Sequence, residues 1–300
     1  MRFDSYHPMI NLIYFATTIG FAIWFDHPVF VLVAYISAFA YSVKLKGVRA
    51  LIFDLCLIPF ILGYAAIYSY YNHFGVTELR QNIIGNQITL ESVVYGVQIG
   101  VTAATVIMLF SCVFAIFTAD KVVYLFGKVS PRLSLFLSIA LRAVPRIKER
   151  AGKINVAQRG IGRGCRQGNI LRKVRNAVRL VSMVITWTME DFVESSMSMK
   201  CRGYLLKGRT AFSIYRFDNR DRSFVVAVFL CLTLIGVAVA FDQTAIYYDP
   251  QIIMNRITPL SYIFYLAYVV LFLMPMTLQI AGEFKYKQAK KEDKEMVCKL

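Results

Sequence analysis

The stretch SVVYGVQIGVTAATVIMLFSCVFAIFT, residues 92–118, decides the fold class, because it contains no charged side chain. A helix needs about 20 apolar residues to cross the hydrocarbon core of a bilayer. Inside lipid, every backbone polar group must also be hydrogen-bonded within the protein, and a helix achieves this within one segment. This stretch therefore predicts a transmembrane helix.

Five further segments are apolar enough to cross a membrane, and the first two of them are short. They lie at residues 8–25, 29–43, 50–71, 224–241 and 260–280. The 300-residue chain is 57% hydrophobic, with a mean hydropathy of +0.54. This composition is more apolar than that of a soluble domain of similar length. We therefore expect an all-α, polytopic membrane protein with about six spans.

The distribution of charge predicts the orientation of these spans. Residues 119–223 hold 22 Lys and Arg against 7 Asp and Glu, and thus carry +15 of the chain's net charge of +16. The connections expected on the opposite side hold two basic residues, Arg80 and Arg256, against Asp26, Glu78, Glu91, Asp242 and Asp249. The positive-inside rule then places both termini and residues 119–223 in the cytoplasm.

This pattern divides the chain into four parts. Spans one to four occupy residues 1–118, a cytoplasmic helical section occupies 119–223, spans five and six occupy 224–281, and a basic cytoplasmic tail occupies 282–300. In the cytoplasmic section we expect a short amphipathic helix at 120–127, a helix that Pro145 kinks or breaks, and a second long helix at 169–202. The middle of that second helix, 180–187, is apolar on all sides and should be buried.

The end of the second long helix is the sharpest local feature. Glu190, Glu194, Ser198 and Arg202 recur every four residues and share one helix face. Gly203 is placed to adopt the left-handed conformation that ends a helix. Arg202 would then project past a rigid helix end, which suits a forked contact with a partner's carboxylate. The alternative is an ordinary capped helix with a solvated arginine.

A second Arg-Gly pair lies upstream, in Gln158-Arg159-Gly160. It also falls at the end of a predicted helix, so the two pairs suggest a paired docking device. Arg163-Gly164 could serve in place of Arg159-Gly160, which leaves two registers open for the first pair.

Several segments together resemble the T component of energy-coupling factor transporters, of the EcfT/CbiQ type, over nearly the whole chain. These segments are Asp120-x-x-x-x-Leu125, Leu141-Arg-Ala-Val-Pro145, Ala157-Gln-Arg-Gly160, and Ser198-Met-Lys-Cys-Arg-Gly-Tyr204 followed by Gly208-Arg-Thr210. In that family, two Ala-Arg-Gly motifs end the coupling helices, which sit in grooves of two ABC ATPases. In this chain Gln-Arg-Gly and Cys-Arg-Gly stand at those places.

The resemblance implies a non-catalytic transporter subunit of the bacterial inner membrane. It would couple ATP hydrolysis by two partner ATPases to uptake of a vitamin or metal ion by a small substrate-binding membrane subunit, the S component. The expected partners are therefore these proteins and the lipid bilayer, with no cofactor and no nucleic acid. The ATPase-docking residues would be Arg159, Gly160, Arg202 and Gly203, with Arg163 as the alternative register, supported by Gln158, Glu190, Glu194, Met199 and Tyr204.

Other functions find less support in the sequence. A conventional ABC importer permease with its own translocation pathway would carry a cytoplasmic E-A-A-x-x-x-G loop, which does not occur here. No G-x-x-x-x-G-K-[ST] motif occurs either, so ATP hydrolysis is expected in partner subunits. An intramembrane enzyme would need a catalytic constellation within the spans, and none is found.

The histidines and the intramembrane Asp54 are expected to have structural roles and not to bind a metal. His7, His27 and His73 form no H-x-x-x-H pair, so a metal site is not expected. Asp54 lies inside a span about one turn from its cytoplasmic end, where a helix-end or interhelical hydrogen bond is expected.

Overall fold

The computed structural model describes residues 3–72, 74–81, 87–165, 167–204, 206, 215, 217–249, 252–254 and 258–297. Three features of the sequence lie outside these residues, namely His73, Arg256 and the Gly208-Arg209-Thr210 motif. The chain divides into two compact units. Unit 1 comprises Met1–Thr118 and Tyr215–Leu300, and unit 2 comprises Ala119–Ile214.

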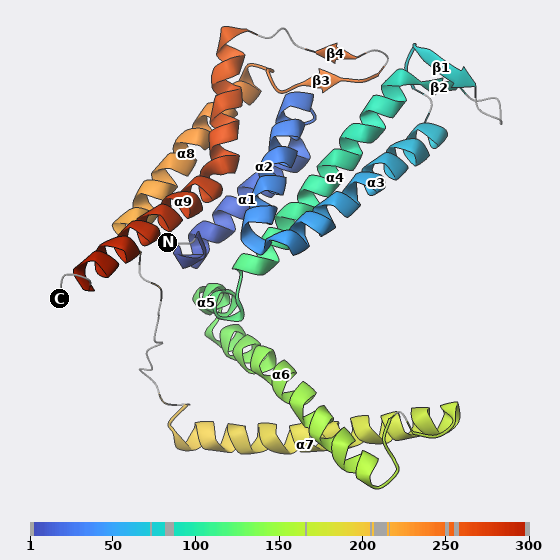
Figure 1. The fold of residues 1–300 in the computed structure, drawn as a ribbon, viewed down its shortest axis with the longest axis vertical. Coiled ribbons are helices and arrows are strands. Elements are labelled where there is room, and N and C mark those ends of the chain that lie inside the picture. Colours follow the sequence, from blue (N-terminus) through green and yellow to red (C-terminus); the bar gives the residue numbers. More distant parts are fainter. Residues whose placement is uncertain are drawn as a thin grey trace. The chain divides into compact units, whose positions relative to one another are not determined.

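Over its described residues, unit 1 is a bundle of six helices preceded by a short 3-10 turn, Phe3–Ser5 (Figure 1). The helices are α1 (Pro8–Trp24), α2 (Pro28–Lys46), α3 (Val48–Tyr71), α4 (Leu90–Ile116), α8 (Asn219–Ala240) and α9 (Pro259–Val297). Each matches one predicted span, so the all-helical fold class is confirmed. Five are long and apolar enough to cross a membrane, and α1, with 17 residues, is shorter. The protein is a multi-pass membrane protein.

Two small hairpins, which the sequence did not predict, lie at one end of unit 1 (Figure 1). β1 (Glu78–Gln81) pairs with β2 (Gln87–Thr89), and β3 (Ile246–Tyr247) pairs with β4 (Ile253–Met254), both antiparallel. Their strands are two to four residues long. Such strands are too short for an alternating pattern to stand out.

Two glycines on α4 allow it to approach α3 closely. A Cβ added at Gly96 would lie 3.2 Å from the backbone of Ala65, and one at Gly100 would lie 3.2 Å from the carbonyl oxygen of Ile61. Small residues four apart let membrane helices pack backbone to backbone. Away from this contact, apolar residues of α3 such as Leu62 are well exposed in the isolated chain, as expected of a lipid-facing surface.

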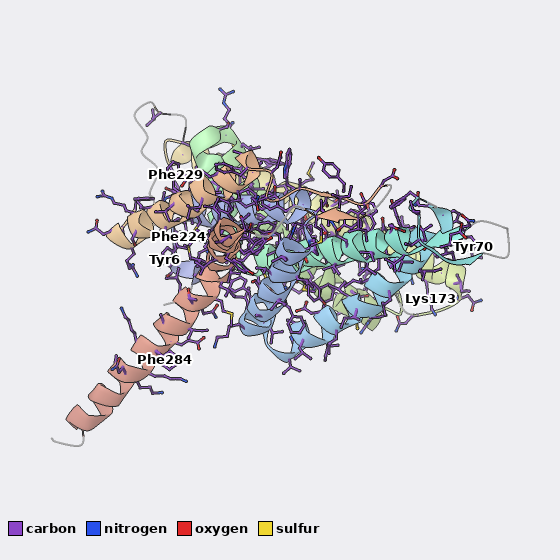
Figure 2. The ribbon with its side chains drawn as sticks, turned by 90° about the horizontal axis from the view of Figure 1, so that it is seen from above. Tyr6, Tyr70, Lys173, Phe224, Phe229 and Phe284 are labelled. Atoms are coloured by element: carbon purple, nitrogen blue, oxygen red, sulfur yellow. The ribbon has the colours of Figure 1, made fainter. Side chains whose placement is uncertain are left out.

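An aromatic cluster fixes the N-terminal segment to the bundle. The ring of Phe3 lies 5.4 Å from Tyr14 of α1 and 5.5 Å from Phe224 of α8. Tyr6 and Phe224, labelled in Figure 2, are also 5.5 Å apart. Tilted and edge-on ring pairs at such distances add to the stability gained from burial.

The predicted basic tail continues α9 as helix as far as Val297. Figure 2 shows this part of α9, marked by Phe284, extending away from the rest of unit 1. At its base, Lys44 of α2 forms an ion pair of 2.7 Å with Glu283.

Two of the histidines cap helices. The Nδ1 atom of His7 accepts a hydrogen bond from the backbone of Met9, and that of His27 accepts one from Val29, both at 3.3 Å. Burial lowers the pKa of His27. A neutral ring retains the acceptor that the cap needs, because a protonated imidazole has only donors.

Asp54 is fully buried, next to Ser42 and Lys46 of α2. Neither of its carboxylate oxygens has a hydrogen-bond partner within bonding geometry among the described residues. The Ser42 hydroxyl of α2 is the interhelical partner that faces this carboxylate, as the sequence led us to expect, although the two groups do not meet strict hydrogen-bond geometry.

The described part of unit 2 forms three helices, α5 (Ala119–Val129), α6 (Pro131–Gly160) and α7 (Ile170–Cys201). α5 packs against α6, and α6 crosses α7 (Figure 1). Pro145 lies inside α6 without breaking it, because the helix runs unbroken from Pro131 to Gly160. A break at this proline is thus ruled out.

The prediction that residues 180–187 are buried on all sides is wrong. Val184 is buried, but Val181 and Ile185 are 52% and 56% exposed. The physical reason is that α6 covers one side of α7 within unit 2 and leaves the other side of this apolar segment uncovered.

Candidate functional site

The end of α7 has the geometry that the sequence predicts. Gly203 has a φ of +77°, and Arg202, directly before it, is the C-cap residue of α7. The amide of Gly203 donates to the carbonyl of Lys200 at 3.0 Å, and the amide of Tyr204 donates to that of Met199 at 3.1 Å. These two bonds define a Schellman cap, so Arg202 stands at a rigid helix end.

The end of α6 also forms a Schellman cap, but at a different glycine from the one the Arg-Gly pair suggested. Gly162 has a φ of +74°. Its amide donates to the carbonyl of Arg159 at 3.0 Å, and the amide of Arg163 donates to that of Gln158 at 2.9 Å. Gly160 is therefore in the last helical turn. The view of the two Arg-Gly pairs as similar helix ends is corrected, since Arg202 directly precedes its left-handed glycine and Arg159 lies three residues before its own.

The turn after α6 folds back over Arg159. A Cβ added at buried Gly164 would collide with the side-chain Cγ of Arg159, so the aliphatic stem of that arginine lies against this glycine. Asn176 of α7 donates to the carbonyl of Gly164 at 3.3 Å and ties the turn to the second helix. Arg163 follows the left-handed Gly162, and its side chain is exposed. Of the two registers, Arg159 is the arginine whose side chain the turn supports.

Arg150 joins α6 to α7 where the two helices cross. Its guanidinium forms an ion pair of 2.8 Å with Asp191 and lies 5.0 Å from the centre of the Trp187 ring. It also donates to the carbonyl oxygen of Trp187 at 3.4 Å. The side chains of Arg150 and Asp191 are 17% and 28% exposed. Such a partly buried contact holds the two helices together where they cross.

The two arginine ends lie on opposite sides of this crossing. Gln158 contacts Met183, while Arg150 contacts Asp191, so the two helices run in opposite directions through the crossing. At 1.5 Å per residue, Arg159 is about 13 Å along α6 from Arg150, and Arg202 is about 17 Å along α7 from Asp191. Unit 2 thus holds two separated arginines on one cross-braced frame.

A groove of about 1140 Å³ lies between α6 and the second half of α7. Glu194, Ser198, Met199, Arg202 and Tyr204 line it from the side of α7. Its opposite wall is formed by apolar residues and arginines of α6: Leu135, Phe136, Ile139, Arg142, Arg146 and Ile147. Of the four residues that the sequence places on one face of α7, Glu194, Ser198 and Arg202 line this groove. Glu190 does not.

The sequence reasoning missed the contacts of Arg150, Asp191 and Trp187. An ion pair between two helices that are distant in sequence has no periodic pattern, so no signal in a single sequence could have paired these residues. Gln158, expected to support the first arginine, is half-buried and lies 3.7 Å from the sulfur of Met183.

Comparison of the chain with known proteins found a matching family and several relatives. The family model described as "CbiQ: Cobalt transport protein" matches residues 4–212. The chain is 29% identical over 113 residues to the energy-coupling factor transporter transmembrane protein EcfT of Clostridium kluyveri, which is 37% of this chain and 42% of that protein. It is 35% identical over 92 residues to EcfT of Lacticaseibacillus paracasei, 30% of this chain and 34% of the relative. The matched region thus spans about two fifths or less of the length of these curated relatives.

Proposed function

The chain belongs to the CbiQ family, and on this premise we propose that it is the transmembrane T component of an energy-coupling factor transporter. Its relatives with this function in their names support the proposal, although each alignment covers part of the chain. The proposed role is a non-catalytic scaffold that couples ATP hydrolysis by two ABC ATPases to uptake of a vitamin or metal ion. A separate S component would bind that substrate.

The observation that carries this proposal is the pair of arginines on the cross-braced frame of unit 2. Each stands at or near a capped helix end, on opposite sides of the crossing. A guanidinium in such a place can form forked hydrogen bonds to a carboxylate of a partner. Two separated arginines suit two partner subunits, so we assign ATPase docking to Arg159 with Gly160 and to Arg202 with Gly203.

The proposed coupling follows from the stiffness of the two long helices, which would turn about the crossing that joins them. When two ATPases close on ATP, the surfaces that hold the two arginine ends move relative to each other. Long helices joined at a crossing transmit that displacement instead of absorbing it. The S component would then be tilted or released. Under the positive-inside rule, unit 2 and both termini lie on the cytoplasmic side, where ATP is available.

Copurification of the ATPases with the full-length chain tests the docking assignment. Arg202→Ala and Arg159→Ala should each reduce the recovered ATPase at least several-fold, because the loss of a charge-assisted contact costs about 1.5–3 kcal/mol. Arg163→Ala is the matched control, since this exposed arginine follows the left-handed glycine of the α6 cap. If Arg163→Ala reduced recovery and Arg159→Ala did not, the first docking site would belong to the other register.

A pair of glycine variants separates docking from folding. Gly160 and Gly152 are both exposed within α6, and an added Cβ at either meets no atom within 4 Å. Gly160→Ala should preserve stability and still weaken ATPase binding, because a partner must approach the backbone there. Gly152→Ala should change neither. Normal ATPase recovery and normal substrate uptake in an Arg159→Ala/Arg202→Ala double variant would refute the proposed function.

A further inference from the structure

One side of α7 is apolar and exposed along the first two thirds of the helix. Its residues follow one another in steps of three or four, which places them on one face. They are Ile170, Val174, Val178, Val181, Ile185 and Met189, here called the apolar stripe, and each is at least 52% exposed. The buried residues of α7, Val184 and Thr188, lie outside the stripe.

A row of arginines follows the edge of the apolar stripe. Arg172, Arg175 and Arg179 are exposed and recur in steps of three and four. At 3.6 residues per turn they lie within about 60° of one another around the helix, next to the stripe. The first part of α7 is therefore a basic amphipathic helix whose apolar side has no cover in unit 2.

The charge around this helix is of one sign. Residues 150–189 contain nine Lys and Arg and no Asp or Glu. The acidic residues of α7, Glu190, Asp191 and Glu194, lie in its later part. A long basic segment beside an apolar stripe complements a surface that is both densely negative and apolar beneath. The interface of an anionic bilayer has this composition.

We propose that residues 170–189 of α7 bind the headgroup region of an anionic bilayer. The apolar stripe would enter the boundary between headgroups and acyl chains, and the arginine row would bind lipid phosphates. Arginine suits this contact because its planar fork pairs with phosphate through two hydrogen bonds. The inference requires a membrane protein and does not depend on ATPase docking.

Tryptophan quenching tests the position of the stripe in the full-length chain. The chain has two tryptophans, Trp24 and Trp187. Val178→Trp, with both native tryptophans replaced by Phe, places a single reporter on the stripe. As a control, Trp24→Phe alone leaves Trp187 as the single reporter, on the side of α7 that contacts Arg150 of α6. Each variant is reconstituted into nanodiscs of phosphatidylcholine alone or of phosphatidylcholine with phosphatidylglycerol, and quenching by aqueous acrylamide is measured.

We expect the reporter at 178 to be protected several-fold more strongly in the discs that contain phosphatidylglycerol, while quenching of Trp187 changes little. High salt should reduce this difference, because it screens charge attraction at the surface. Equal quenching at 178 in both kinds of disc would overturn the proposal. Protection that arises only after partner proteins are added would also overturn it and would assign the stripe to a protein.

Two triple variants distinguish the effect of the arginine row on membrane binding from the effect of net charge. Changing Arg172, Arg175 and Arg179 together to Gln should remove the effect of phosphatidylglycerol, since each basic residue near an anionic surface contributes about a fivefold gain in affinity. The control triple, with equal loss of charge on exposed residues of α6, changes Arg132, Lys148 and Lys153 to Gln. If the control triple removed the effect equally, the arginine row would have no specific role.

Discussion

Breaking the contact between Arg150 and Asp191 should loosen the crossing of α6 and α7, and a double-mutant cycle can measure by how much. The variants are Arg150→Gln, Asp191→Asn and the double variant. Each substitution keeps the approximate size and polarity of the side chain but removes its charge. The cycle isolates the interaction between the two side chains, because effects on the rest of the protein cancel.

The magnitude follows from the geometry of the crossing. Exposed ion pairs contribute about 0.2–1 kcal/mol, but this one is 2.8 Å long and its side chains are 17% and 28% exposed. We therefore expect a coupling free energy of about 1–2 kcal/mol. Arg150 also contacts the ring and the carbonyl of Trp187, and a cation–π contact adds about 0.5–2 kcal/mol. Arg150→Gln should accordingly destabilise the protein more than Asp191→Asn does.

The assay is unfolding of the full-length chain by SDS in mixed micelles, followed by tryptophan fluorescence. In a Trp24→Phe background the single remaining tryptophan, Trp187, lies at the crossing itself and reports its opening. Lys153 and Glu149, an ion pair of 2.7 Å whose side chains are both 66% exposed, supply the control cycle. Its coupling should fall within the error of the measurement.

Two results would refute this reasoning. A coupling below about 0.3 kcal/mol would mean that the pair contributes no more than distant, independent residues do. Equal losses for Arg150→Gln and Asp191→Asn would mean that the contacts of Arg150 with Trp187 carry no weight.

Three further predictions use the same unfolding by SDS, followed through Trp24 in a Trp187→Phe background for the two sites in unit 1 and through Trp187 for the site in unit 2. Gly100→Leu should lower the free energy of unfolding by about 1–3 kcal/mol, since the new side chain would push against the backbone of Ile61. An unchanged free energy of unfolding would contradict the close packing of α3 and α4. Because burial lowers the pKa of His27 below its usual 6.5, the unfolded state binds more protons below that pH, so stability should fall as the pH falls through about 6. His27→Asn, a cap that does not titrate, should flatten this slope, and an unchanged slope would exclude His27 as its source. Gly162→Ala should lower the free energy of unfolding by about 1–2 kcal/mol, because the φ of Gly162 is +74°. Gly160→Ala should leave it unchanged or raise it. A larger loss for Gly160→Ala than for Gly162→Ala would place the cap at Gly160.

The membrane spans could be predicted from the sequence because the signal for a span is local. A helix that satisfies its own backbone needs only length and apolar side chains, and residues 92–118 supply both. The end of α7 was also predictable, since a glycine directly after Arg202 can adopt the left-handed conformation without strain.

Features that depend on a neighbouring element were not predictable. The apolar segment 180–187 looks buried, yet how much of it is covered depends on the single helix that crosses it. At the end of α6 the sequence offers glycines at 160, 162 and 164, and each could end the helix. Only the path of the turn, held by Asn176 at the carbonyl of Gly164, selects Gly162 as the cap.

The different positions of the two arginines have a consequence for docking. Arg202 is the C-cap residue of α7 and can be approached along the helix axis. Arg159 leaves the last turn of α6 from its side, with its stem held against Gly164. Two partner subunits would therefore meet these arginines from different directions relative to the helices, even if the subunits were alike. Since Gly164 already restricts the stem of Arg159, less side-chain entropy is lost there on binding, and the same substitution should have unequal effects at the two ends.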